Sequence, residues 1–460
     1  MNKSSNKLVS VYITNYNYGK YLKQSIDSVL NQTFKNFELI IIDDGSTDNS
    51  KEIIKNYQYN SKIKIVFQKN KGLTFSNNVA LKLAMGEFIV RLDSDDYFHK
   101  DALKNLVSGF YSDEIGLVFG DWFSVNEFGD FIETNKRHDF KNNVTLYDQP
   151  AHGACTMFRT KFLKKINGYD ETISRQDGYE LWLRFIKYYK VNNINIPVFY
   201  YRQHSKSLTT NEKKLLNTRA KILEKHAKKY SETKNDKFVA IVPVRGSEID
   251  GRSRPFLKLG TKFLIDYTLE ELIKCTSLKK IVVSTPSDKL IKYIENSYTS
   301  KKIILHKRSL EISRINVSIR ETILESLKLI SDLDLFNSFL SISIETPFKR
   351  SQLIESAINI KKIFDVDTVI GLRQTESLLY KHNGKGMVPL QKEESKLKLE
   401  SEQKYEKIPG LLLRDIKDYL KTSNYYGRKI GHVIFDQEAA LTIKSSLDLI
   451  FAEAILNSNK

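Results

Sequence analysis

The stretch that decides the fold is FIVRLDSDD, residues 88–96, in which an apolar run is followed at once by an acidic cluster. The run has the composition of a β-strand. In an open α/β sheet, ligands bind at the carboxyl ends of the strands, which is where Asp93, Asp95 and Asp96 would lie. Clustered carboxylates suit a divalent cation that bridges the phosphates of a nucleotide. A solvated acidic turn capping the next helix is the alternative, and these nine residues alone do not decide between the two.

The first half of the chain alternates between short strand-like runs and amphipathic segments. Strands are expected at 9–13, 37–42, 63–67 and 88–92, and helices at 21–30, 49–57 and 74–85. Strands and helices that alternate at this spacing predict right-handed βαβ units around a mostly parallel sheet. A chain of 460 residues also exceeds the usual size of one hydrophobic core. We therefore predict an α/β fold with two Rossmann-like nucleotide-binding domains in tandem.

A Lys-rich, polar stretch separates the two halves. Residues 212–236 form the best linker candidate, helical at first and ending in SETKND. After it the alternation restarts, with a strand at 238–242, a helix at 264–273 and a strand at 280–284. The expected organisation is a first domain over 1–211, a helical, polar, basic linker over 212–236 and a second α/β domain over 237–460.

Composition limits the compartment and the partners. The net charge of +18 is dispersed rather than gathered into a stripe with aromatic residues, so a nucleic-acid partner is not expected. Attraction to an anionic membrane surface is a more plausible reason for the positive charge than binding of nucleic acid. The alternative is that the charge simply reflects a Lys- and Asn-rich composition. The distant Cys155 and Cys275 fit a reducing compartment. With no apolar stretch near the roughly 20 residues that span a bilayer, we expect a cytoplasmic protein, with peripheral association at the inner face of the membrane left open.

A second strand-like run also ends in carboxylates. Residues 40–48 read IIIDDGSTD, so Asp43 and Asp44 would lie at the carboxyl end of a strand and could accept hydrogen bonds from a base or ribose. An ordinary βα turn built on Asp-Gly is the alternative. Because two acidic strand ends recur in one predicted sheet, both would face the same crevice.

Several segments of the first half resemble the family 2 glycosyltransferases with the GT-A fold in both order and spacing. The matching segments are VYITNYN (11–17), SIDSVLNQT (25–33), residues 38–48, NKG (70–72) followed by Asn78, GE (86–87) and LDSDD (92–96). The agreement extends over about the first 210 residues. It implies a metal-dependent, inverting transfer of a sugar from a nucleotide-sugar donor to a glycan or lipid-linked acceptor, of the hexosyltransferase type used in surface polysaccharide biosynthesis.

The resemblance also implies roles for individual residues. The donor-binding positions are Thr14, Asn15, Tyr16, Asp43, Asp44, Asn78, Asp93, Arg202 and His204, and Asp95 is the position that holds Mg²⁺ or Mn²⁺ with the diphosphate. The base that deprotonates the acceptor corresponds to Asp177 in QDGYELWLR, where Gln176 replaces the usual Glu.

Two of these roles have structural alternatives. Asp177 could simply cap the helix that follows it, and Arg202 and His204 could lie at an ordinary strand exit. Residues 152–155 and 168–170 resemble the acceptor-side loop of the family.

The second half resembles the cytidylyltransferases that activate sialic acid-like sugars and Kdo. The matching segments are 239–247, 263–268, 282–285, 345–350, 367–370, 380–386 and 427–453. The resemblance implies nucleotide binding by Arg245, Gly246 and Arg254, and it allows a homodimer through this domain.

Departures from that family bear on the activity of the second half. Thr442 and Lys444 stand where the family has its two metal-binding Asp residues, the opening loop reads SEIDG at 247–251, and Pro286 replaces a common Asp. A protonated Lys cannot ligate Mg²⁺. A degenerate domain is therefore expected. The alternatives are a bifunctional enzyme that also makes a CMP-activated acidic sugar, and a non-catalytic module that senses a nucleotide or binds a partner.

Overall fold

The computed structural model describes residues 7–136, 153–204, 212–231, 236–375, 379–382, 387–390, 404–422 and 424–458. The chain divides into two compact units. The first contains residues 1–211 with 379–402, and the second contains 212–378 with 403–460. Both are mixed α/β and each is built on a sheet rich in parallel strands. No helix in these ranges is both long and apolar enough to cross a bilayer.

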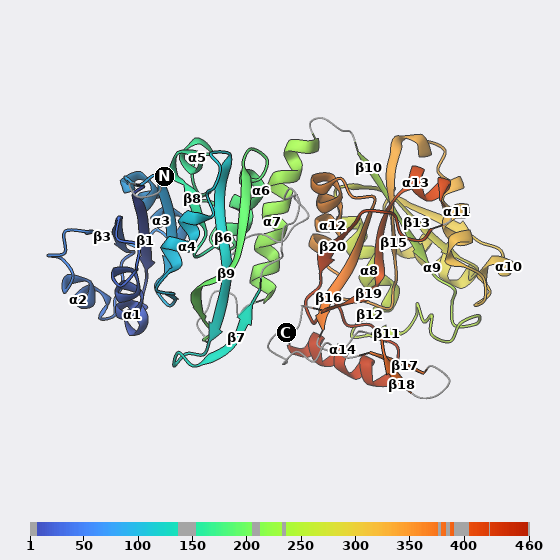
Figure 1. Ribbon diagram of the computed structural model, residues 1–460. Coiled ribbons are helices and arrows are strands. Elements are labelled where there is room, and N and C mark those ends of the chain that lie inside the picture. Colours follow the sequence, from blue (N-terminus) through green and yellow to red (C-terminus); the bar gives the residue numbers. More distant parts are fainter. Residues whose placement is uncertain are drawn as a thin grey trace. The chain divides into compact units, whose positions relative to one another are not determined.

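The first unit begins with the predicted alternation (Figure 1). Its opening elements are β1 (Val9–Asn15), α1 (Gly19–Leu30), β2 (Phe37–Asp43), α2 (Ser50–Lys55), β3 (Ile63–Phe67), α3 (Leu73–Leu83) and β4 (Phe88–Asp93). The strands run parallel in the order β3-β2-β1-β4. The structure thus confirms all seven expected elements, each within two residues at either end.

The other half of this sheet is mixed in direction. Its elements are β5 (Tyr97–Phe98), α4 (Ala102–Ser108), β6 (Ile115–Val125), β7 (Phe131–Asn135), β8 (Met157–Arg159), α5 (Thr160–Lys165), α6 (Asp177–Phe185) and β9 (Lys190–Arg202). The order continues β4-β8-β6-β9-β5, with β7 also pairing with β6. Strand β8 is antiparallel to both of its neighbours, whereas β6 and β9 are parallel to each other.

Alternate residues of the central strands pack on opposite faces of the sheet, as the two-residue period of a strand requires. From β1, Val9, Val11 and Ile13 join the core with α1, α2 and α4. Tyr12 joins the opposite core with α3, α5 and α6. Because both faces are covered, these strands read as continuous apolar runs rather than as alternating ones. The polar residues that end each strand are left at one edge.

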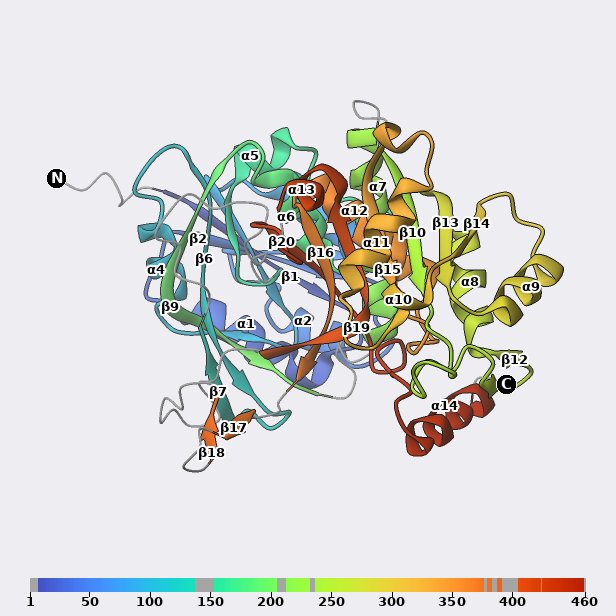
Figure 2. The same ribbon diagram turned by 90° about the vertical axis from the view of Figure 1, so that its right-hand side faces the viewer.

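The second unit has its own seven-stranded sheet (Figure 2). Its strands are β10 (Lys237–Pro243), β13 (Leu278–Thr285), β14 (Ile303–Lys307), β15 (Phe336–Ile342), β16 (Thr368–Thr375), β19 (Lys404–Asp415) and β20 (Ile430–Ile434). Strands β14-β13-β10-β15 are parallel, β19 is antiparallel to β15 and β16, and β20 is parallel to β16.

Helices and short strands complete this unit. They are α7 (Glu212–Ser231), β11 (Lys258–Leu259), β12 (Lys262–Phe263), α8 (Leu264–Lys274), α9 (Asp288–Ser297), α10 (Leu310–Ser313), α11 (Ile319–Lys328), α12 (Ser351–Phe364), α13 (Ile416–Lys421) and α14 (Ser446–Ser458), with a 3₁₀ turn at Leu333–Leu335. The short hairpin β17 (Tyr380–His382) and β18 (Met387–Pro389) falls within 379–402 and so groups with the first unit.

The stretch expected to be a linker is largely a packed helix. Helix α7 contacts α12, and its residues Ile222, Leu223 and Ala227 are buried. These apolar side chains are spaced as one face of an amphipathic helix, and burying that face stabilises the unit. The domain boundaries stay a prediction, but most of 212–231 belongs to the body of the second unit.

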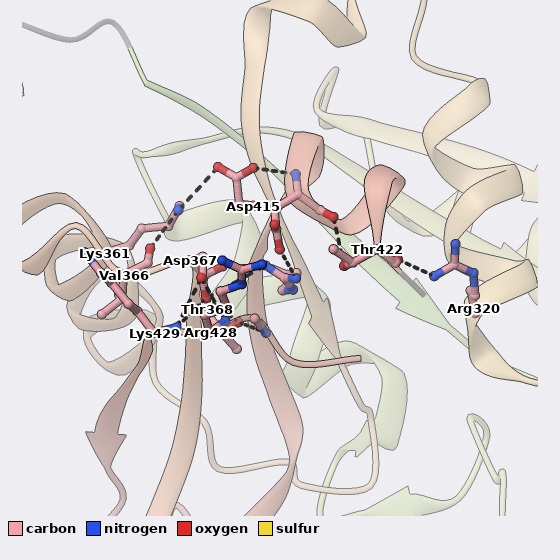
Figure 3. Close-up of polar contacts among 12 residues, drawn as sticks. Arg320, Lys361, Val366, Asp367, Thr368, Asp415, Thr422, Arg428 and Lys429 are labelled. Carbon is pink, nitrogen blue, oxygen red and sulfur yellow. Dashed lines mark hydrogen bonds and ion pairs between the residues drawn. The ribbon is translucent and has the colours of Figure 1, made fainter. Parts of the chain in front are cut away.

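A polar network fixes the start of β16 to the loop before β20 (Figure 3). The Asp367 carboxylate accepts hydrogen bonds from the backbone N–H groups of Arg428 (2.9 Å) and Lys429 (3.1 Å). The fully buried Arg414 donates to the Asp367 carbonyl (3.3 Å) and also pairs with Asp418. These contacts of Asp367 are all made within the second unit, so we assign this network to the fold.

Candidate functional site

The carboxyl ends of β1, β2 and β4 bring together the acidic residues predicted from the sequence. In the parallel register, Thr14 lies opposite Asp93, and Asn15 lies opposite Asp43. Asp43 is fully buried, and its carboxylate accepts hydrogen bonds from the Asn15 side chain (3.0 Å) and from the Ser46 backbone (3.1 Å). The buried Asp43 carboxylate therefore joins the ends of β1 and β2.

Asp44 shapes the neighbouring turn. Its carboxylate accepts hydrogen bonds from the backbone N–H groups of Lys71 (2.9 Å) and Gly72 (2.8 Å) and from the Gln68 amide (2.7 Å). Gly72, with φ of +93°, occupies the left-handed region that favours glycine and immediately precedes α3. The buried Asp44 carboxylate thus fixes the entry to α3.

Asp95 and Asp96 lie in the tight turn after β4. Asp96 Oδ1 accepts the Arg202 backbone N–H (2.9 Å), which ties the turn to the end of β9. Burial raises the pKa of Asp96 above its usual range, and the negative charges of Asp95 and Asp93 add to the shift. Asp95 remains partly exposed, and its Oδ2 lies 3.0 Å from His204 Nε2.

Arg202, expected as a donor-binding residue, makes several contacts within the protein around the acidic turn. Its buried guanidinium donates to the carbonyls of Asp95 (2.9 Å) and Glu127 (3.0 Å) and to Gln24 Oε1 (2.6 Å). The guanidinium also lies over the Tyr21 ring, 4.6 Å from its centroid. Arg202 therefore clamps the acidic turn, and His204 is the residue of this pair that reaches the Asp95 carboxylate.

Asp177 is the first residue of α6, directly after Gln176 in the left-handed conformation (φ +54°). Its Oδ2 accepts a hydrogen bond from Asn77 Nδ2 (3.2 Å) and is paired with Arg91 Nη1. A carboxylate in the first turn is favoured by the helix dipole. The pairing with Arg91 and Asn77 nevertheless places Asp177 at the sheet edge and not merely at a helix cap.

Arg91 is a residue that the sequence reasoning did not select. It lies within the apolar run of β4, is only 4% exposed, and pairs through Nε with Asp93 Oδ1 (2.9 Å) as well as with Asp177. Partial burial raises the pKa of Asp93 to about 6, with Arg91 opposing the shift and the charges of Asp95 and Asp177 adding to it. The signal that could have found Arg91 is a charged residue inside a strand whose neighbours are all apolar, since buried charges are normally paired.

The other predicted positions of this unit are Asn78, Tyr16 and the loop at 152–155. The Asn78 amide donates to the Tyr169 carbonyl (2.9 Å) and accepts the Tyr169 N–H (2.8 Å), so it joins α3 to the loop at 168–171 instead of facing the strand ends. Tyr16 follows β1 and is 47% exposed. His152, in the expected acceptor-side loop, lies outside the described residues, whereas Gly153 packs against Arg91.

In the second unit, the ends of β10 and β14 carry arginines. Arg245 follows β10 and lies 3.7 Å from an Asp250 carboxylate oxygen, and Gly246 has φ of +86°. Arg308 follows β14, is 3% exposed and donates from Nη1 to Thr322 Oγ1 (2.7 Å), while its Nε and Nη2 have no partner among the described residues. Burial, together with the nearby positive charge of Arg245, lowers the pKa of Arg308 to about 10. The sequence reasoning missed Arg308.

The remaining predicted positions of this unit carry no metal-type cluster. Arg254 lies in the loop after β10 and is partly exposed. Thr442 Oγ1 lies 3.2 Å from Thr346 Oγ1, and the Lys444 N–H donates to Asp448. Within the described ranges of both units, no three His, Cys, Asp or Glu side chains converge closely enough to hold a metal ion unaided.

One family model matches a segment in the first half of the chain. Residues 10–168 match the family model for Glycosyl transferase family 2. The chondroitin synthase of Escherichia coli is 30% identical over 190 residues, which cover 41% of this chain and 28% of that protein. The hyaluronan synthase of Pasteurella multocida is 32% identical over 191 residues, covering 41% of this chain and 20% of that protein. The chain thus spans less than a third of the length of either relative.

Among solved structures, TarS 1–349 of S. aureus in complex with UDP-GlcNAc has a TM-score of 0.40 and 22% sequence identity, covering 47% of this chain and 66% of that one. The family match falls within the first unit and includes β1, β2, β4 and the acidic turn.

Proposed function

From the glycosyltransferase family 2 domain at residues 10–168, we propose that the chain is a metal-dependent, inverting glycosyltransferase with the GT-A fold. It transfers a hexose from a nucleotide-sugar donor to a glycan or lipid-linked acceptor in surface polysaccharide synthesis. The observation that carries this proposal is the line of side chains from Asp177 through Arg91 and Asp93 to Asp95 and His204. It offers a base at one end and metal-ligand atoms at the other.

Unpaired buried polar atoms support a ligand at the strand ends. Thr14 Oγ1, Asn15 Oδ1 and Asp96 Oδ2 are buried and have no hydrogen-bond partner among the described residues. Such atoms are normally satisfied in a folded protein, and a bound polar ligand or water can satisfy them. In this proposal Thr14, Asn15, Tyr16 and Asp93 contact the donor, whereas Asp43, Asp44, Asn78 and Arg202 support those contacts from behind.

Asp177 is suited to act as the general base. Its Oδ2 is held by Arg91 and Asn77, and no residue in the described ranges bonds to Oδ1. A carboxylate anchored through one oxygen keeps the other in a defined direction, which is what proton abstraction from an acceptor hydroxyl requires. Displacement from the face opposite the departing diphosphate inverts the sugar's configuration.

The Asp95 and His204 pair fits a divalent cation. The Asp95 carboxylate is the ligand type that suits Mg²⁺ or Mn²⁺, and the His204 imidazole nitrogen, 3.0 Å from one of its oxygens, is a common metal ligand of softer preference. Mg²⁺ is commonly held by one or two protein ligands plus substrate phosphates, so a pair is enough when the donor supplies the rest. An ion bound by this pair would supply Lewis-acid neutralisation of the charge on the departing diphosphate.

The decisive experiment compares Asp177→Asn with the wild-type chain. We expect transfer to fall by 10²- to 10⁴-fold, because general-base assistance is lost, while donor affinity stays within about threefold. Donor affinity is measured by calorimetry and transfer with a panel of UDP-, GDP-, dTDP- and CMP-sugars. Asp113→Asn is the matched control, because the Asp113 side chain is fully exposed. Wild-type turnover in Asp177→Asn would remove Asp177 from the mechanism, and failure to bind any donor would remove the function.

For the second unit we propose a degenerate cytidylyltransferase-like, Rossmann-like domain that binds a phosphate-bearing ligand such as a nucleotide. The supporting observation is Arg308, which has two nitrogens without a partner in the described ranges and whose pKa is lowered by the positive charge of Arg245. Two guanidinium groups near each other repel unless an anion joins them. In this proposal Arg245, Gly246 and Arg254 belong to the same ligand site.

Titration of the full chain with CTP, CMP and pyrophosphate tests the second proposal. Arg308→Gln should weaken binding by about tenfold or more, whereas Arg252→Gln, at a largely exposed loop position, should not. Release of pyrophosphate from CTP and an acidic sugar would favour the bifunctional alternative. The same preparation allows the proposed homodimer to be tested by light scattering and the proposed membrane association by flotation with anionic vesicles.

A further inference from the structure

One buried arginine joins the two sides of the proposed transfer site. We propose that Arg91 is a positioning residue, which holds the Asp177 carboxylate in its reactive orientation and ties it to Asp93 on the donor side. This inference rests on the proposed glycosyltransferase function. It adds a residue for which neither the acidic motif nor the family match supplies a role.

The contacts of Arg91 define this role. Nη1 donates a hydrogen bond to Asp177 Oδ2, and Nε lies 2.9 Å from Asp93 Oδ1 in an ion pair that lacks hydrogen-bond geometry, so different nitrogens of one planar group face two carboxylates. The fork of a guanidinium can hold two partners at fixed directions, which a single ammonium group cannot do in the same way. Asn77 Nδ2 adds a second donor to the same Asp177 oxygen, at 3.2 Å. Asp177 is therefore fixed through Oδ2.

The surroundings leave the Arg91 side chain little freedom. Its backbone carbonyl accepts the Cys155 N–H (2.7 Å), and its side chain is buried against Gly153. A Cβ atom at Gly153 would lie 2.7 Å from Arg91 Nη2, closer than real contacts allow. The absence of a side chain at Gly153 therefore makes room for the guanidinium where it reaches Asp177.

The positions of the two carboxylates explain why a shared arginine matters. Asp93 ends β4, whereas Asp177 begins α6, 84 residues later in the sequence. No covalent constraint keeps them aligned, and the two negative charges repel each other. A single cation between them fixes both the spacing and the orientation. Misplacement of a reactive group by about 1 Å can cost about 100-fold in rate.

The test is a double-mutant cycle with Arg91→Lys, Asp177→Asn and the double variant. Lysine keeps the charge but loses the fork, so we expect kcat to fall about 10- to 100-fold, with the donor KM within about threefold. In the Asp177→Asn background the same change should alter the residual rate less than about threefold, because the group that Arg91 orients is already inactive.

Arg159→Lys is the matched control. Arg159 is an equally buried arginine on the adjacent strand β8, paired with Glu87 (2.7 Å) and donating to the Ile115 carbonyl (2.9 Å). It should change thermal stability without lowering kcat. Gly153→Ala supplies a second route to the same effect, since it displaces Nη2 while the Arg91 charge stays in place. It should lower kcat about tenfold with little change in donor affinity.

The outcomes separate this inference from the proposed function. If the wild-type chain transfers sugar but Arg91→Lys and Gly153→Ala keep wild-type kcat, or if Arg91→Lys costs the same factor in both backgrounds, Arg91 is not a positioning residue. If Arg91→Lys proves unfolded by circular dichroism, Gly153→Ala decides the question. If the wild-type chain transfers no sugar from any donor, the proposed function itself has failed.

Discussion

The two units place opposite charges at the same kind of sheet edge. In the first unit, the carboxyl ends of parallel strands carry Asp93, Asp95 and the polar pair Thr14 and Asn15, whereas in the second the corresponding ends carry Arg245 and Arg308. Open α/β sheets place ligands at this edge whatever the chemistry. The difference teaches that the architecture supplies the location, and that the residues following each strand set its charge, on which the proposed cation site of the first unit and the proposed anion site of the second depend.

The two units also differ in how they treat a buried arginine. Arg91 lies between two carboxylates, whereas Arg308 has a neutral hydroxyl partner and two nitrogens with no partner in the described ranges. A buried charge that is paired resists removal, because its partners would be left alone. A buried charge that lacks a partner is a cost to the fold. The two arginines should therefore respond to the same substitution with opposite signs.

The largest expected effect is the loss of stability in Arg91→Met. Removing the guanidinium leaves Asp177 and Asp93 close together without a counter-charge, so we expect a loss of about 3–5 kcal/mol in the free energy of unfolding of the first unit. Urea denaturation of the full chain, followed by tryptophan fluorescence, measures it, because both tryptophans, Trp122 and Trp182, lie in this unit. A loss below about 1 kcal/mol would contradict the pairing.

The next largest effect concerns the dependence of transfer on a metal ion, which is expected for the sheet edge of the first unit and not for that of the second. Replacing Asp95 by Asn removes the carboxylate charge of the proposed metal pair, and we expect transfer to fall about 100-fold or more, as when one electrostatic stabiliser of a transition state is lost. A chelator should abolish wild-type transfer, and added Mn²⁺ should restore it. Arg308→Gln, at the edge of the other unit, should leave transfer unchanged. Full turnover in the presence of the chelator would remove the metal from the proposal.

Local pattern was enough to predict most of the fold. The run at 88–92 predicts β4 (Phe88–Asp93), and the run at 280–284 predicts the core of β13 (Leu278–Thr285), because a strand covered on both faces must be apolar at every position. The placement of Asp43 and Asp93 at one edge also follows, since parallel strands end together. The packing of α7 could not be predicted, because its polar residues outnumber the apolar face that α12 covers.

Side-chain direction is the part of the site that the sequence could not supply. Whether Asn78 faces a donor or Tyr169 depends on a loop about 90 residues away, and Arg202 reaches Gln24 across 178 residues. The pairing of Arg91 with Asp177 is equally non-local. A sequence pattern can show that a buried arginine needs a partner, but the partner is decided by how α6 packs on the sheet.

A third prediction uses pH to probe another buried cation of the second unit. Lys349 is buried and donates to the Ser343 carbonyl (2.7 Å) and the Thr346 carbonyl. Burial lowers the pKa of Lys349 to about 7, although the charge of Glu345 opposes the shift. Since an unfolded chain holds this proton up to a pKa of about 10.4, folding releases it between these values, and stability should rise with pH in that window.

The measurement compares wild type with Lys349→Met at pH 7, 8 and 9. Between pH 7 and 9, the free energy of unfolding of the wild type should increase relative to that of the variant by at most about 1.4 kcal/mol per pH unit. Below pH 6 the two plots of this free energy against pH should run parallel, because the proton is bound in both the folded and the unfolded state. Parallel curves between pH 7 and 9 would show that Lys349 stays charged in the fold. The second unit would then tolerate buried positive charge more readily than its contacts indicate.

The smallest effect is the stabilisation expected in Arg308→Met. Methionine fills a similar space without a charge, so removing the buried guanidinium with its two unpaired nitrogens should raise the free energy of unfolding of the second unit by about 1 kcal/mol. Far-ultraviolet circular dichroism in urea follows this transition. Saturating pyrophosphate should stabilise the wild type but not the variant, because a ligand that binds only the folded state adds to its stability. Arg308→Met could instead destabilise the second unit, as Arg91→Met is expected to destabilise the first. Arg308 would then have a structural role, and the proposed contrast between a cation site in the first unit and an anion site in the second would be wrong for the second unit.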